Sequence, residues 1–176
     1  MVLNVRRVVT GQDEKGRSKI LFDGVAENIK EMESMPGVAL TDLWETLSLP
    51  VDNRGMTDSA LRPVRLTAPN PGTLFRLVEF PPDSNWRGVA HAGTAFASIG
   101  AHGAPDEGSD DPMRHKTNTI DYIIVMKGEI YAILDEGKVL LKTGDVFIQR
   151  GTMHSWSVRT DEPCLVGVVL VSADPI

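Results

Sequence analysis

Residues 115–128, with the sequence HKTNTIDYIIVMKG, decide the predicted fold. β-Branched and aromatic residues dominate the stretch, which is typical of a β-strand, and Gly128 marks its end. Successive side chains of a strand point to opposite faces. One face is therefore expected to carry His115, Thr117, Thr119, Asp121, Ile123 and Val125. The sequence predicts that His115 and Asp121 look into one space.

A second histidine joins this group if the chain turns back toward the strand. Turn residues at Gly137 and Gly151 predict two such reversals, and they would bring His154 to the same space. The outcome would be a polar pocket inside a small β-barrel.

The remaining C-terminal sequence consists of short β-rich runs separated by turn residues. We expect strands at residues 122–126, 129–134, 138–142, 146–149, 155–158 and 165–171. Turns at this spacing predict an all-β sandwich or barrel. The run from Tyr122 to Met126 is apolar on both faces, so we expect its outer face to be covered by leading strands or by another subunit.

Over residues 113–172 the chain resembles the cupin family, whose first motif reads H-x-H, three or four residues, E, six residues, G. His115 matches the first histidine and Gly128 the glycine, while Thr117 stands at the second histidine and Asp121 at the glutamate. The resemblance implies a jelly-roll barrel and a homodimer.

The second cupin motif reads G, five residues, P-x-G-x-x-H, three residues, N. Gly144, Gly151 and His154 match it in kind, but the spacing is one residue short. Arg150 stands near the expected proline and Val158 at the asparagine. The fold is therefore expected to be that of a single-domain cupin, and fold alone does not fix an activity.

We predict one domain over residues 1–176, divided into three zones. Residues 1–82 form an N-terminal β-strand extension that begins with a hairpin of residues 5–10 and 19–22, and residues 114–172 form the cupin core. Residues 83–113 form a helix and loop insertion, with a short helix over 89–99 and an exposed flexible loop over 103–112. That loop is expected to be either a lid over the barrel or a surface insertion.

Composition favours a small-molecule partner. The chain has 24 acidic against 18 basic residues and a formal net charge of −6, which disfavours binding to nucleic acid or to anionic membranes. The start of the sequence is unlike a signal peptide, and no run of about 18 apolar residues occurs, so we expect a cytoplasmic protein. Cys164 is the only cysteine and is expected to be a buried strand thiol.

His115, Asp121 and His154 are candidate ligands of a divalent metal such as Fe, Mn, Zn or Ni, because imidazole and carboxylate suit these ions. Thr117 and the short Asp121 side chain would weaken such a site. Gln149 is a candidate further oxygen ligand and His102 a candidate replacement ligand.

The same three residues are the candidate catalytic groups, and Gln149, Trp156, Tyr131 and Arg76 are candidate residues of a substrate pocket. Each also has a purely structural interpretation, as a hydrogen-bonded or packed member of the core. Three ionisable groups in an apolar interior, however, cost desolvation unless a metal, a ligand or one another compensates for it.

Two functional hypotheses follow. In the first, the protein is an enzyme that performs lyase, dehydratase, decarboxylase or isomerase chemistry on a small organic acid or aromatic compound. A metal would polarise the substrate, or Asp121 paired with His115 would exchange a proton without a metal. In the second, the protein is a non-catalytic binder of a small molecule.

Overall fold

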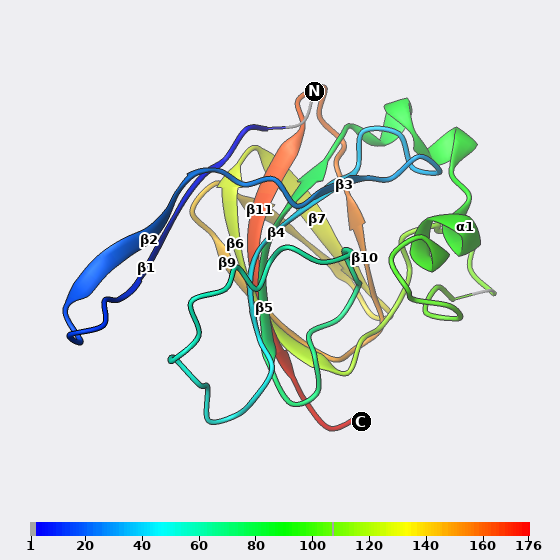
Figure 1. Ribbon diagram of the computed structural model, residues 1–176. Coiled ribbons are helices and arrows are strands. Elements are labelled where there is room, and N and C mark those ends of the chain that lie inside the picture. The colour runs from blue at the N-terminus through cyan, green and yellow to red at the C-terminus, as the bar shows by residue number, and fades with distance from the viewer. Residues whose placement is uncertain (1–2, 107) are drawn as a thin grey trace.

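Strands are the main secondary structure of the computed structural model, which describes residues 3–106 and 108–176 (Figure 1). In chain order the elements are β1 (Arg6–Gln12), β2 (Ser18–Val25), β3 (Ile29–Glu31), β4 (Ala39–Thr46), β5 (Thr73–Phe80), two 3-10 turns (Asp83–Asn85 and Arg87–Val89), α1 (Ala92–Ala97), β6 (Thr119–Lys127), β7 (Glu129–Leu134), β8 (Lys138–Lys142), β9 (Val146–Arg150), β10 (His154–Ser157) and β11 (Cys164–Ser172). Within the described ranges, no helix is long and apolar enough to span a membrane.

Two sheets form the body of the fold. The larger has the strand order β3-β4-β5-β11-β6-β9 and the smaller the order β10-β7-β8, and every neighbouring pair is antiparallel. One apolar core takes side chains from both sheets, including Leu74 and Val125 of the larger sheet and Ile130 and Ala132 of the smaller. The fold is therefore the all-β jelly roll that was predicted, with its core between the two sheets.

The predicted alternation along residues 115–125 is confirmed. Side chains at the odd positions from His115 to Val125 are buried, whereas Lys116, Asn118, Tyr122 and Ile124 are exposed. Only the part from Thr119 onward pairs continuously as a strand, next to β11 and β9. The strand thus delivers its polar odd-numbered residues to the interior of the jelly roll.

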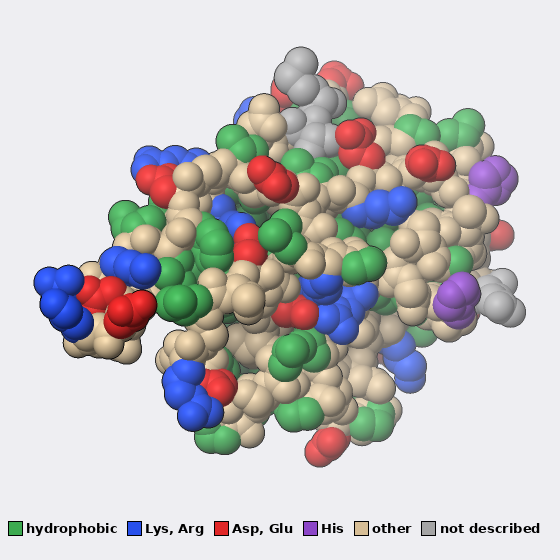
Figure 2. Space-filling model, in the orientation of Figure 1, with side chains coloured by type: hydrophobic (Ala, Val, Ile, Leu, Met, Phe, Trp, Pro, Cys, Tyr) green, Lys and Arg blue, Asp and Glu red, His purple; other side chains and the backbone are tan. Residues whose placement is uncertain are grey.

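The N-terminal hairpin is present as predicted, and it projects away from the body (Figure 1). Charged side chains gather at its tip (Figure 2), which contains Asp13, Lys15 and Arg17. Its base packs on the outer face of the larger sheet, where Val5 and Ala26 meet Leu43, Leu77 and Leu165.

The hairpin leaves the rest of that outer face uncovered. Tyr122, Ile124 and Met126 of β6 are about half exposed, at 49%, 51% and 51%. Phe75 of β5 and Val146 and Ile148 of β9 are exposed beside them. The expected cover over the Tyr122–Met126 run is therefore not supplied by the leading strands of the same chain.

The insertion differs in two ways from the prediction. Its helix is shorter, because α1 covers only Ala92–Ala97 and a 3-10 turn occupies Arg87–Val89. The following loop is less exposed than its composition suggested, since charged side chains tie it to the barrel. Arg114 pairs with Asp106 and Asp135, and Asp111 accepts hydrogen bonds from the Arg87 and Ser155 side chains. Glu107 lies outside the described residues.

Gly128, which ends the strand that decides the fold, occupies a position that only glycine fits. Its φ is +78°, and an added Cβ would lie 2.7 Å from the carbonyl oxygen of Pro163 and 3.1 Å from the Cα of Cys164. Both neighbours are backbone atoms, which cannot rotate away. Gly137, in the next turn, has a φ of +94° but nothing within 4 Å of its Cβ position.

These two glycines give a matched test of the fold. Gly137→Ala should lower the free energy of unfolding by roughly 1–2 kcal/mol, because it adds only the strain of a left-handed backbone. Gly128→Ala should cost clearly more, on the order of 3 kcal/mol, because it adds a backbone clash to that strain. Urea denaturation monitored by circular dichroism measures both changes, and equal losses would contradict the close approach of β6 to the start of β11.

Candidate functional site

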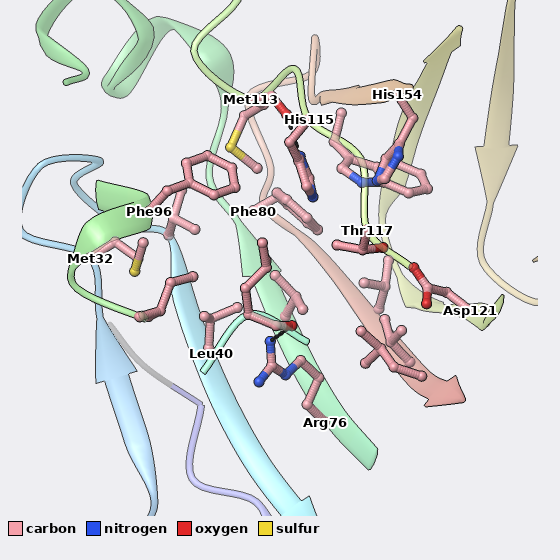
Figure 3. A pocket seen from close by; sticks show the side chains of 18 of the residues that line it. Met32, Leu40, Arg76, Phe80, Phe96, Met113, His115, Thr117, Asp121 and His154 are labelled. Atoms are coloured by element: carbon pink, nitrogen blue, oxygen red, sulfur yellow. Dashed lines mark hydrogen bonds between the residues drawn. The ribbon is translucent and has the colours of Figure 1, made fainter. Parts of the chain in front are cut away.

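An apolar cavity of about 100 Å³ lies in the core between the sheets (Figure 3). Most of its wall is aliphatic, aromatic or methionine side chains, contributed by both sheets, by the segment before β4 and by α1. Its polar lining residues are Arg76, His115, Thr117, Asp121 and His154. The structure therefore places all three candidate catalytic residues on one cavity, as the sequence predicted.

A backbone bridge between two separate segments brings the histidines together. The His115 N–H donates to the carbonyl of His154 at 3.0 Å, and the His154 N–H donates back to that of His115 at 2.9 Å. Residues that exchange both hydrogen bonds lie directly opposite each other with side chains on the same face. The ring centroids of His115 and His154 are accordingly 4.5 Å apart.

The same local geometry fixes the tautomer of both rings. Nδ1 of His115 lies 2.7 Å from the carbonyl oxygen of Met113, and Nδ1 of His154 lies 2.9 Å from that of Thr152. Because a carbonyl oxygen only accepts, each Nδ1 carries the hydrogen and each Nε2 keeps a free lone pair. The site thus presents two imidazole acceptors.

Burial keeps both rings uncharged. Desolvation, together with the neighbouring His154, lowers the pKa of His115 to about 3. Desolvation also lowers the pKa of His154. A proton on either ring would lie in an apolar wall beside Phe96 or Trp156, whose ring centroids are 4.9 Å from His115 and 5.7 Å from His154. Near neutral pH the pair accepts hydrogen bonds and carries no charge.

Asp121 is the acidic group of the cavity, and its pKa is raised. Burial raises its pKa to about 6, while the Thr119 hydroxyl and the positive charge of Arg76 act in the opposite direction. Its Oδ1 atom is buried and has no hydrogen-bond partner. Such an atom calls for an explanation, and a ligand in the cavity would supply one.

Arg76 also lines the cavity, at the end opposite the histidines (Figure 3). Its side chain is 3% exposed, and Nε donates to Oδ1 of Asp42 at 2.9 Å. It also donates to the backbone carbonyls of Leu66 and Arg65. This buried ion pair holds a positive charge at the cavity wall.

Two of the three expected metal ligands, His115 and His154, lie side by side at the cavity. The two Nε2 atoms have the correct tautomer for metal binding, since each Nδ1–H is held by a carbonyl. In the part of the chain that the structure describes, however, no group of three His, Cys, Asp or Glu side chains is placed to hold a metal ion. Asp121 lies beyond Thr117 from the histidines (Figure 3). The three residues share a cavity but do not form a three-ligand centre.

The proposed partnership of Asp121 with His115 is wrong. The Nδ1 of His115 donates to the carbonyl of Met113 and not to a carboxylate. A backbone carbonyl two residues earlier orients the ring, so the imidazole keeps its position whatever the charge of Asp121.

The other candidate residues divide into two groups. Trp156 and Arg76 line the cavity, as expected for a pocket. Gln149 points inward and is 1% exposed, but its amide donates to the carbonyl and hydroxyl of Thr152 and it is not part of the cavity wall.

Tyr131 and His102 lie away from the cavity. Tyr131 alternates with the buried Ile130 and Ala132 on β7 and stacks against Arg159, whose guanidinium carbon is 4.5 Å from the ring centroid. This alternation turns the Tyr131 ring to the opposite face of the strand, so its assignment to the pocket is wrong. His102 is exposed and does not line the cavity.

Some site residues were not found from the sequence. Met32, Met113 and Phe96 form the wall beside His115, and Asp42 holds Arg76. Phe96 had a signal, because it lies on the apolar side of the predicted helix. The methionines had none, because they come from loops that reach the cavity only through the tertiary fold.

A comparison with protein-family models agrees with this architecture. The family model described as "Cupin domain" matches residues 102–171, which include the bridge segment of His115, the strands β6 to β10 and most of β11.

Three known proteins illustrate the similarity. The "cupin-domain-containing oxidoreductase fogC" of Aspergillus ruber is 25% identical over 171 residues, which cover 94% of this chain and 70% of that protein. The "phomopsin biosynthesis cluster protein C'" of Diaporthe leptostromiformis is 47% identical over 51 residues, which cover 28% of this chain and only 27% of that protein. A solved structure, of a "Cupin 2 conserved barrel domain protein" from Salinispora arenicola, has 16% identity and a TM-score of 0.36, covering 57% of this chain and 64% of that one.

The family match, the motif residues and the jelly roll lead to one assignment. Residues 102–171 match the cupin domain, and the two sheets of the chain form the cupin jelly roll.

Proposed function

We propose that the protein is a proton-transfer enzyme, an isomerase or dehydratase, that acts on a small and largely apolar organic compound held in the cavity. The observation that carries this proposal is the buried Asp121 carboxyl, which lines an apolar cavity with its Oδ1 atom unpartnered. A polar hydrogen of a bound ligand would satisfy this oxygen.

The surroundings of Asp121 suit it to acid–base work. A catalytic group serves best when its pKa lies near the working pH, because it can then both remove and return a proton. The raised pKa of about 6 meets that condition. In an isomerisation Asp121 would take a proton from one substrate carbon and return it to another, and no oxidant or reductant is needed.

The other polar groups position the substrate. His115 and His154 present Nε2 lone pairs, which accept hydrogen bonds from a substrate hydroxyl. Their lowered pKa values make them weak bases, so the proton-transfer role falls to Asp121. The apolar wall excludes water, which strengthens each of these contacts.

The name of the Aspergillus relative describes that protein as an oxidoreductase. The cavity of the present protein suits redox chemistry less well than proton transfer. The sequences are 25% identical, which leaves the site residues free to differ. Redox chemistry requires a cofactor or a redox metal. The donors at this cavity are two imidazoles with no third His, Cys, Asp or Glu ligand placed beside them among the described residues.

We further propose that the protein is a homodimer through the outer face of the larger sheet. Phe75, Tyr122, Ile124, Val146 and Ile148 project from the neighbouring strands β5, β6 and β9 around β11, and all are exposed. Such a patch marks an interaction surface. The charged residues of this face, Arg150 and Glu79, lie near the ends of β9 and β5, and the centre of the face is apolar. A second copy is the occupant that fits, because an apolar centre is complementary to itself, as a twofold interface requires.

The apolar face alone is too small for a stable dimer interface. Four strands spaced about 4.8 Å apart and five residues long give an area of roughly 300 Å². A stable interface needs about 800 Å² per partner. The projecting hairpin β1–β2, whose Val8, Ile20 and Val25 are exposed, continues from the same face and would supply the difference.

The proton-transfer role can be tested by an assay that does not require the substrate to be known beforehand. The wild-type protein is incubated in D₂O with a library of small organic acids and ketones. Its substrate should exchange carbon-bound hydrogen for deuterium, and mass spectrometry identifies that compound by its increase in mass. Asp121→Asn should slow that exchange at least 100-fold, since it removes the acid–base group. The exposed Asp161→Asn is the control and should leave the rate unchanged.

The rate of exchange should also rise with pH through about 6, as Asp121 loses its proton. Arg76 is the charged group that faces it, and the two histidines stay neutral over this range. Binding of library compounds without exchange would point instead to a non-catalytic carrier, which the apolar wall of the cavity would also serve. One equivalent of Fe, Mn, Zn or Ni that is lost in His154→Ala would contradict the metal-free mechanism.

Stability provides a second prediction for Asp121. The raised pKa means that the folded protein holds the proton more tightly than the unfolded chain, so stability is lost as pH rises from about 4 to about 6. Asp121→Asn removes this loss. At pH 8 the variant should be more stable than the wild type by roughly 1–3 kcal/mol, and at pH 4 the two should be alike. Urea denaturation at both pH values measures the difference, and a variant that is less stable at pH 8 would show that the ionised carboxylate is compensated in the fold.

The dimer can be tested by light scattering after gel filtration. The wild-type mass should be twice the chain mass of 19.2 kDa, and Ile124→Lys should reduce it to 19.2 kDa by placing a charge in the apolar face. Val139→Lys is the matched control, because Val139 is exposed to a similar extent but lies on β8 of the other sheet. A monomeric wild type, or equal effects of both variants, would refute the proposed interface.

A further inference from the structure

The ion cluster behind the cavity contains more positive than negative charge. Three guanidinium groups, from Arg62, Arg65 and Arg76, share two carboxylates, from Asp42 and Glu45. Asp42 pairs with Arg76 through Oδ1 and with Arg62 through Oδ2, and Glu45 pairs with Arg62 and Arg65. The cluster therefore has a formal charge of +1.

The three arginines differ in their access to solvent. The side chains of Arg62 and Arg65 are 15% and 40% exposed, so water screens part of their charge. Arg76 is 3% exposed, and its one carboxylate partner is shared with Arg62. Its remaining partners, the carbonyls of Leu66 and Arg65, accept hydrogen bonds but carry no full charge. Asp121, the other carboxyl that acts on the charge of Arg76, is uncharged below its pKa of about 6. In that state the charge at the cavity wall is the one that neither water nor a carboxylate of its own compensates.

We propose that Arg76 makes the cavity selective for small monocarboxylic acids with an apolar body, by binding their carboxylate. This inference rests on the proposed function, in which the cavity is the substrate site. A buried guanidinium binds a carboxylate through charge-assisted hydrogen bonds. With Asp121 protonated, a single negative charge in the ligand would bring the cluster and its ligand to neutrality.

The rest of the cavity sets the shape of the acid. An apolar cavity of about 150 Å³ admits benzene. The present volume of about 100 Å³ is smaller and thus suits a short linear or branched acid without an aromatic ring. With its carboxylate at Arg76, such a molecule would point its other end toward the Nε2 atoms of His115 and His154, which would accept a hydrogen bond from a hydroxyl group there (Figure 3).

The decisive experiment compares acids with their neutral amides on the wild-type protein. The probes are isobutyrate against isobutyramide, and propionate against propionamide. Protein labelled with ¹³C at the methionine methyl groups reports binding, because Met32, Met35 and Met113 line the cavity whereas Met56 and Met126 are exposed and serve as internal references. Each acid should bind at least ten-fold more tightly than its amide, with shifts confined to the three cavity methionines.

Two variants then locate the source of that preference. Arg76→Gln removes the charge at the wall but keeps donors for the nearby carbonyls, and it should abolish the ten-fold preference. Arg65→Gln removes the same charge from the solvent side of the same cluster and should keep the preference. Equal loss in both variants would show a general effect of cluster charge and would overturn the assignment to Arg76.

The outcomes separate this inference from the proposed function. Equal binding of acid and amide to the wild type would refute the carboxylate preference and leave the cavity as a binding site. Failure of every probe to shift the cavity methionines would refute both. If Arg76→Gln does not fold, the wild-type comparison of acid with amide still decides the question.

Discussion

The site depends above all on the reciprocal pair of backbone hydrogen bonds between His115 and His154. These two residues are far apart in the sequence, and the bridge holds them directly opposite each other on a common inward face. Each ring is then held by the carbonyl two residues before it, so backbone atoms alone determine both orientation and tautomer. The arrangement needs no second ionisable group, and for that reason Asp121 is free to act independently of the histidines.

The three kinds of polar group at the cavity are compensated to different degrees. The histidines avoid a desolvation cost by staying neutral, and Arg76 is stabilised by Asp42 and two carbonyls. Asp121 has the least compensation, with one buried oxygen left without a partner. A buried polar atom without a partner lowers stability, and proteins retain such atoms where a ligand can bind to them. In the proposed function, this order of compensation makes Asp121 the reactive group and Arg76 the anchor.

The strand pattern and the cavity-facing residues could be predicted from the sequence, because both follow from alternation. The period of two along residues 115–125 placed His115 and Asp121 inward, and the turn glycines placed His154 with them. Contacts between distant segments could not be predicted. Tyr131 was placed on the wrong face because the register of β7 relative to the cavity depends on tertiary pairing, and Asp42 was missed because its partner Arg76 is 34 residues away in the sequence.

The departures from the cupin motif gain a physical meaning from this geometry. Thr117 stands at the position of the second motif histidine, and its hydroxyl group shares a hydrogen bond of 2.7 Å with the hydroxyl group of Thr119. It therefore adds no third imidazole nitrogen to those of His115 and His154 at the cavity. At the glutamate position, the shorter Asp121 stays close to its strand and near Arg76. Both substitutions move the site away from a compact set of metal ligands and toward a carboxyl next to a fixed positive charge. Those two features match the proposed function, in which the site holds an organic anion and exchanges a proton with it. On that proposal, the two changes that weaken metal binding also favour acid–base chemistry.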